Sequence, residues 1–103
     1  MDSDDRRIVE SPIYQGVDEQ IAYILTTTPW GTAVPTSPAV VMKDDSGLDV
    51  SSTNLSGSAS INGNTVVTPT VKSLSAGAKY RLEIKFNISG NIFETWTDVY
   101  GQT

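Results

Sequence analysis

The clearest pattern in the sequence is an alternation of apolar and polar residues in its last quarter. From Tyr80 to Ile88 every second residue is apolar, and the residues between them are polar. This period of two predicts a strand that buries one face. Ser89-Gly90-Asn91 indicates a turn, and the stretch from Ile92 to Tyr100 predicts a returning antiparallel strand.

Charged residues choose the register of this predicted hairpin. A two-residue loop at Ser89-Gly90 places Glu94 opposite Lys85 and Asp98 opposite Arg81 on the outer face. A three-residue loop would instead turn both acidic side chains toward the core, at a cost of roughly several kcal/mol for each unpaired charge. The two-residue loop is therefore preferred.

The same register turns two aromatic side chains outward and so defines candidate site residues. Trp96 and Tyr100 are expected on the outer face, beside Arg81 and Lys85. Aromatic residues among charges are typical of binding surfaces, although cover by the chain itself would explain Trp96 equally well. Trp30 is a further candidate, with a lid over one end of the core as the favoured interpretation and a binding aromatic as the alternative.

Shorter segments upstream show the same alternation between turn residues, and no stretch keeps a helical apolar pattern. Strands are predicted over residues Arg6–Glu10, Gln20–Thr27, Ala39–Asp44, Val50–Asn54, Ser58–Ile61 and Thr65–Val71. Thr28–Pro38, with three prolines and a glycine, predicts an irregular loop. Asn62-Gly63 between two such segments predicts a type I′ hairpin turn.

This many short strands in 103 residues indicates an all-β fold. We expect one domain spanning residues 1–103, with residues 1–5 disordered, built as an antiparallel β-sandwich of about seven strands. A small barrel is the alternative.

The segment Leu74-Ser75-Ala76-Gly77-Ala78-Lys79-Tyr80 resembles the tyrosine corner of immunoglobulin-like and fibronectin type III domains. This resemblance implies an immunoglobulin-like sandwich in which Gly77 relaxes the corner. It also implies that the Tyr80 hydroxyl bonds to nearby backbone. The cysteines and tryptophan that frame antibody domains are not present in that arrangement, since the chain has no cysteine.

The whole chain also resembles small immunoglobulin-like proteins from bacteriophage and prophage structural gene clusters. The features that carry this likeness are the acidic start before Arg6–Glu10, the loop Thr28–Gly31, the Ser-rich Leu55–Ser60 and the strand at Tyr80. The resemblance implies a virion structural or assembly protein whose partners are proteins. It also implies synthesis in the host bacterial cytoplasm and incorporation into a virion.

Composition narrows the function further. A net charge of −5 disfavours nucleic acid as a partner, since phosphate binding needs clustered Lys and Arg. Without cysteine or histidine, thiolate and imidazole metal sites are excluded, as are a cysteine nucleophile and a histidine base. We therefore expect no enzymatic activity and no cofactor. No apolar run approaches the ~20 residues of a membrane span, and the start MDSDDRRIVE lacks the pattern of a secretory signal.

Two alternatives remain open at this point. The first concerns the acidic stretch Asp44–Asp49, for which a turn with solvated acids is favoured over a calcium site. The second concerns function, because a carbohydrate or cell-surface binding module, with Trp30 and Trp96 stacked on sugar rings, is the alternative to a virion protein.

Overall fold

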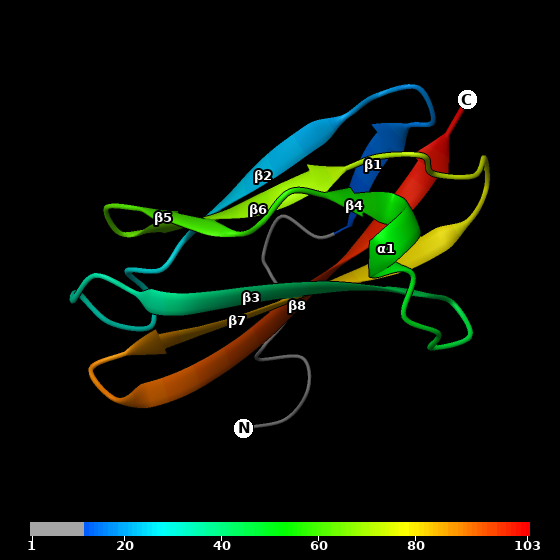
Figure 1. Ribbon diagram of the computed structural model, residues 1–103. Coiled ribbons are helices and arrows are strands. Elements are labelled where there is room, and N and C mark those ends of the chain that lie inside the picture. Colours follow the sequence, from blue (N-terminus) through cyan, green and yellow to red (C-terminus); the bar gives the residue numbers. More distant parts are fainter. Residues whose placement is uncertain (1–11) are drawn as a thin grey trace.

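The computed structural model describes residues 12–103, which form two β-sheets and one short helix (Figure 1). The elements in chain order are β1 (Ile13–Gly16), β2 (Ile21–Thr26), β3 (Thr36–Asp44), α1 (Ser51–Asn54), β4 (Leu55–Ser56), β5 (Ser60–Asn62), β6 (Thr65–Val71), β7 (Lys79–Ile88) and β8 (Asn91–Gln102). The first sheet has the order β1-β8-β7-β3. The second has the order β2-β6-β4, with β5 also paired to β6.

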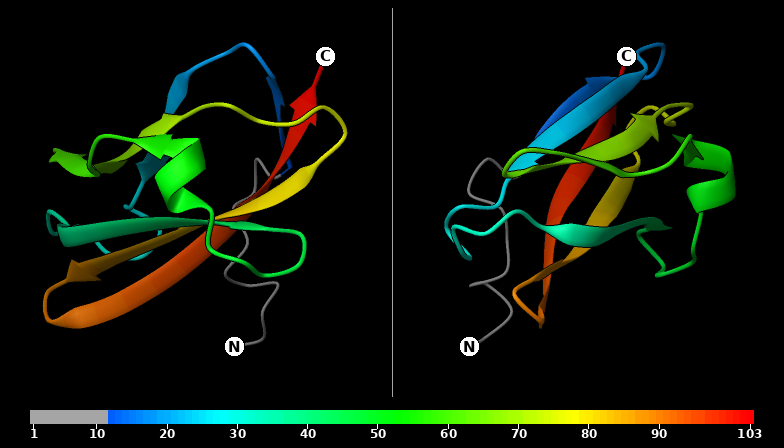
Figure 2. Two further views of the ribbon diagram at one scale, coloured as in Figure 1. Left: turned by 45° about the vertical axis from the view of Figure 1, so that its right-hand side comes forward. Right: turned by 60° about the vertical axis from the view of Figure 1, so that its left-hand side comes forward.

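The two sheets form the layers of a sandwich, as the two views of Figure 2 show. At one end Met42, Leu82 and Val99 of the first sheet pack against Val71 of the second. At the other end Ile84, Phe86 and Ile88 pack against Leu25 and Val66. These residues are all nearly buried between the sheets, and Val40 of β3 packs against both groups.

The predicted register of the last hairpin is confirmed. Phe86 pairs with Phe93, Lys85 with Glu94 and Arg81 with Asp98. The loop consists of Ser89 and Gly90, whose φ angles of 52° and 86° are both positive. Two central residues with positive φ characterise a type I′ turn, the turn whose twist matches that of the flanking strands.

Three of the earlier strands lie where the pattern predicts them, with small changes at their ends. The predictions over Gln20–Thr27, Ala39–Asp44 and Thr65–Val71 correspond to β2, β3 and β6. β3 begins at Thr36, inside the predicted loop, and its register shifts before Ala39. Because Ser37 in this shift has a φ of 52°, the backbone there departs from a regular strand.

The turn between β5 and β6 differs from the predicted type. Asn62 pairs with Thr65, which leaves Gly63 and Asn64 as the loop. Gly63 has a φ of 57°, whereas Asn64 is not among the residues with positive φ. Glycine with positive φ at the first central position is the pattern of a type II′ turn, so the type I′ prediction is wrong.

The prediction of a strand over Val50–Asn54 is wrong, because Ser51–Asn54 forms a single helical turn, α1. The Asn54 N–H donates to the Val50 carbonyl at 2.9 Å. The Asn54 side chain donates to the carbonyls of Lys72 and Ser73, at 3.0 and 3.1 Å. These contacts with the segment after β6 favour the turn over an extended chain, and extended structure resumes at β4.

β1 is a strand that the pattern does not predict. It pairs in parallel with the end of β8, with Ile13 beside Val99. The expectation of a wholly antiparallel sandwich is therefore wrong for the first sheet. Four residues are too few to show a period of two. Residues 12–103 contain eight strands rather than about seven. The strand predicted over Arg6–Glu10 and the disorder predicted for residues 1–5 lie outside the described residues.

Candidate interaction surface

The side of the first sheet that faces away from the core carries most of the predicted site residues. Pairing across β3, β7 and β8 aligns outward residues in three rows. We call this set the outer face, and it consists of Lys43, Arg81 and Asp98, then Val41, Glu83 and Trp96, then Ala39, Lys85 and Glu94. The alternation of the three strands places these residues together, since every second residue points away from the core.

The outer face is hollowed between its strands. A shallow groove of about 400 Å³ is lined by all residues of the last two rows, by Arg81 of the first row, and by Ile84 and Thr95. Ala39, Val41 and Trp96 supply apolar surface to this groove, and Arg81 and Lys85 supply charge. A second, more polar hollow of about 420 Å³ continues from Arg81 toward the turn that follows β3. The groove can therefore contact both apolar and charged groups of a ligand.

The Trp96 indole contacts the guanidinium group of Arg81. The Arg81 Cζ atom lies 3.9 Å from the centroid of the Trp96 ring, which is a cation–π contact. Glu83, the residue directly opposite Trp96, forms an ion pair with Lys43 at 3.4 Å. Trp96 is half-buried, so its ring is positioned on the face rather than free to rotate in solvent.

Asp98 departs from the sequence prediction in its burial. Its register opposite Arg81 is as predicted, but the residue is only 5% exposed. Within its row, Asp98 is buried and Lys43 is half-buried, whereas Arg81 is exposed. Ala39, Lys85 and Glu94 are all exposed.

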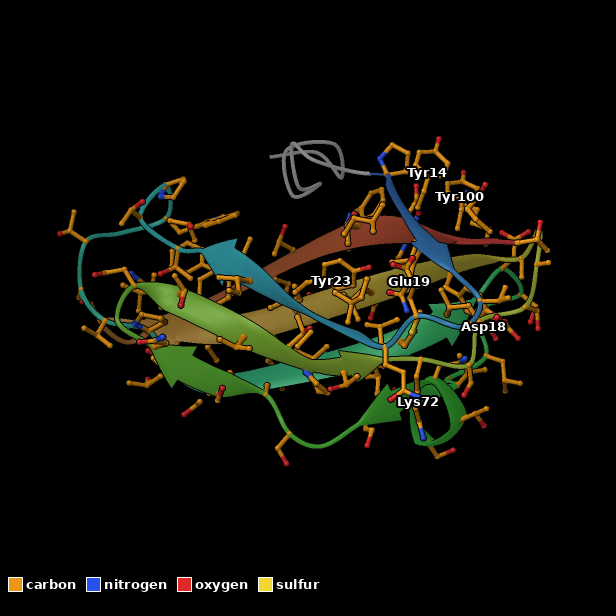
Figure 3. All side chains as sticks on the ribbon, turned by 90° about the horizontal axis from the view of Figure 1, so that it is seen from above. Tyr14, Asp18, Glu19, Tyr23, Lys72 and Tyr100 are labelled. Carbon is orange, nitrogen blue, oxygen red and sulfur yellow. The ribbon has the colours of Figure 1, made fainter. Side chains whose placement is uncertain are left out.

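Tyr100 belongs to a pair of aromatic residues that sequence reasoning did not identify. Tyr14 of β1 pairs in register with Tyr100 of β8, and their rings stack with centroids 5.5 Å apart and planes at 22° (Figure 3). Tyr14 is 65% exposed. The stack depends on the parallel placement of β1, for which the sequence holds no signal beyond the apolar residues of Pro12-Ile13-Tyr14.

Trp30 lies in a different part of the molecule. Its ring packs edge to face against Phe86, with centroids 5.5 Å apart, and Phe86 points into the core from β7. Trp96 points outward from β8 beside the same strand. The two tryptophans therefore lie on opposite faces of the first sheet, and Trp30 covers one end of the core.

The corner before β7 has the geometry that the resemblance implies for Gly77 and Tyr80. The Ser75 N–H donates to the Tyr80 hydroxyl at 3.0 Å, and the Tyr80 ring lies in the core. Gly77 has a φ of +77°, which favours glycine. Its N–H donates to the Gly101 carbonyl at 2.9 Å, which ties the corner to the end of β8.

A buried polar network holds β1 against the second sheet. Gln15 is fully buried, and its side-chain amide donates to the carbonyls of Val71 at 2.8 Å and Glu19 at 2.9 Å. The Tyr23 hydroxyl donates to the Gln15 Oε1 atom at 2.6 Å. Burial, with a smaller contribution from the charge of Glu19, raises the pKa of Tyr23 to about 12. Figure 3 shows Tyr23 and Glu19 side by side below β1.

The acidic stretch after β3 is organised as a turn. The Asp44 carboxylate accepts hydrogen bonds from the Ser46 N–H at 2.9 Å, the Ser46 hydroxyl at 2.6 Å and the Leu48 N–H at 3.0 Å. These bonds, first that of the Ser46 hydroxyl, lower the pKa of Asp44. Across residues 12–103 there is no group of three or more acidic side chains placed to hold a metal ion.

No protein-family model, curated protein or solved structure matches the chain. Within the part of the chain that the structure describes, no helix has the length and apolar character needed to cross a membrane. The assignment of a function therefore depends on the outer face and on the sequence resemblance.

Proposed function

We propose that the protein is an immunoglobulin-like sandwich. In that fold one sheet carries strand F between strands C and G, and the other carries strand E between B and D. The order β3-β7-β8 has the hairpin strand β7 in the central position, and β6 lies between β2 and β4. The hydrogen bond from Ser75 to Tyr80 at the start of β7 also supports this assignment.

The proposed activity is non-enzymatic binding of other proteins, in the structure or assembly of a bacteriophage or prophage particle. The observation that carries it is the contact of Arg81 with Trp96 beside an open groove. Arginine and tryptophan are enriched among the residues that contribute most to protein interfaces. Because the cation–π contact fixes the indole before a partner arrives, less side-chain entropy is lost on binding. The particle itself is inferred from the sequence resemblance.

A sugar-binding role is less well supported by the geometry. A platform for one glycan would need Trp30 and Trp96 on the same surface, whereas Trp30 contacts Phe86 and Trp96 faces the other way. In addition, Arg81 lies over the Trp96 ring where a sugar would stack.

The test is to purify particles from the source organism and measure the copy number of the protein in them by quantitative mass spectrometry. A fixed copy number per particle is expected. Titration of the isolated protein with glycans, followed by tryptophan fluorescence, provides the comparison. Absence from the particles together with saturable quenching by one sugar would reject the proposal in favour of the carbohydrate-binding role.

A further inference from the structure

Strand β2 forms one edge of the second sheet, with β6 on its other side (Figures 1 and 2). The Thr27 N–H donates to the Asn64 carbonyl at 2.8 Å, which continues the pairing with β6. Backbone groups alternate in direction along a strand. The N–H and C=O groups of Ile24 and Thr26 therefore point away from β6, to the side of β2 where no strand of residues 12–103 pairs.

Other edges of the described residues carry features that prevent further pairing. On β3, Pro38 lacks an N–H. The end of β3 is covered by the residues that follow its turn, where the Val50 N–H donates to the Met42 carbonyl at 2.8 Å. β1, β4 and β5 have four residues or fewer. The part of β8 before its pairing with β1 carries the exposed charge of Glu94. Proline, cover, short length and charge are the usual protections of an edge strand.

β2 has few of these protections. Its six residues, IAYILT, include neither a charge nor a proline. The Ile24 side chain is 69% exposed, and Ala22 and Thr26 beside it are also exposed. The only irregularity in the pairing of β2 lies between Ala22 and Ile24, so the stretch Ile24–Thr26 runs in regular register. An uncharged edge with an exposed isoleucine is suited to pairing with another strand.

We infer that β2 pairs antiparallel with β2 of a second copy of this chain. This pairing joins the β2-β6-β4 sheets of the two copies into one continuous sheet. Antiparallel pairing about a two-fold axis lets Ile24 and Thr26 of each copy exchange backbone hydrogen bonds. It also places the exposed Ile24 side chain of each copy opposite Thr26 of the other, on the same face of the joined sheet. Asp18 and Glu19, which precede β2, then lie at opposite ends of the joint, so a chain of net charge −5 pairs without opposing these carboxylates.

This contact uses a different sheet from the outer face and does not depend on the proposed function. Its test is sedimentation velocity of the full chain over a range of concentrations. We expect a reversible dimer in the wild type. Ile24→Lys should raise the dissociation constant of the dimer about tenfold or more, because it places one lysine of each copy at the contact between the two β2 strands. Ile92→Lys is the matched control, since Ile92 is 63% exposed on the first sheet, and it should leave the dimer unchanged.

Amide hydrogen exchange distinguishes pairing of β2 with a second copy from pairing of β2 within one chain. The amides of Ile24 and Thr26 should become protected as protein concentration rises. A chain that stays monomeric up to about 1 mM would overturn the inference, as would equal weakening by the two lysine variants. Protection that is already complete in the dilute monomer would mean that the edge is paired within one chain, and would also overturn it.

Discussion

Replacement of Gln15 by leucine tests the buried network that holds β1 in place. Leucine is close to glutamine in volume but makes no hydrogen bonds. The variant Gln15→Leu therefore leaves the Val71 carbonyl, the Glu19 carbonyl and the Tyr23 hydroxyl without the partner they have in the wild type. Since β1 carries Tyr14, loss of this network also loosens the stack with Tyr100.

The size of the effect follows from how deeply each group is buried. The bond to Val71 is buried, and loss of its partner should cost about 1–3 kcal/mol. The bonds to Glu19 and from Tyr23 are partly buried, where water can replace part of the interaction, at about 0.5–1.5 kcal/mol each. The free energy of unfolding should fall by roughly 2–6 kcal/mol, a large share of the ~5–15 kcal/mol typical of a domain.

Urea denaturation followed by tryptophan fluorescence measures this change. Tyr23→Phe is the comparison, because it removes only the bond to Gln15 Oε1 and should cost about 0.5–1.5 kcal/mol. The double variant should be less destabilised than the sum of the two single variants, by about 1 kcal/mol. A loss below about 1 kcal/mol for Gln15→Leu, or strict additivity, would refute the network as described.

Three further predictions concern single side chains. Tyr80→Phe removes the bond from the Ser75 N–H and should lower the free energy of unfolding by about 1 kcal/mol in urea denaturation; an unchanged midpoint would contradict this role. The pKa of Tyr23 is raised from 10.0 to about 12, so its neutral form contributes stability that is fully present below pH ~10 and lost as pH rises toward 12. Alkaline denaturation should show this loss in the wild type and not in Tyr23→Phe. Arg81→Ala removes the contact with Trp96 and should cost about 0.5–1 kcal/mol, with a shift in tryptophan emission; an unaltered spectrum would argue against the contact.

The sequence predicts the last hairpin well because two independent signals agree there. The alternation from Tyr80 to Ile88 specifies which face is buried, and the charges of Lys85 and Glu94 select the same register. A register error by one residue would move every side chain to the wrong face, so the correct pairing is strongly specified. The outward direction of Trp96 follows from that register alone.

Other parts depend on contacts between distant segments and leave no local pattern. The helical turn at Ser51–Asn54 is held by hydrogen bonds from the Asn54 side chain to the carbonyls of Lys72 and Ser73, 18 and 19 residues away, which leave no signal in the local sequence. The buried position of Gln15 depends on Val71, 56 residues away. The stack of Tyr14 could not be predicted either, since it needs the parallel placement of a four-residue strand.

The most direct test of the outer face as the binding surface is to measure how much of each of two arginine variants is incorporated into particles. Ala39 is exposed and lines the groove, so Ala39→Arg fills it without removing a side-chain contact. Ala33 is also exposed but lies in the loop between β2 and β3, which makes Ala33→Arg the matched control. Incorporation is expected to fall by about tenfold or more for Ala39→Arg and to stay at the wild-type level for Ala33→Arg. Equal incorporation of both folded variants would contradict the assignment of this face.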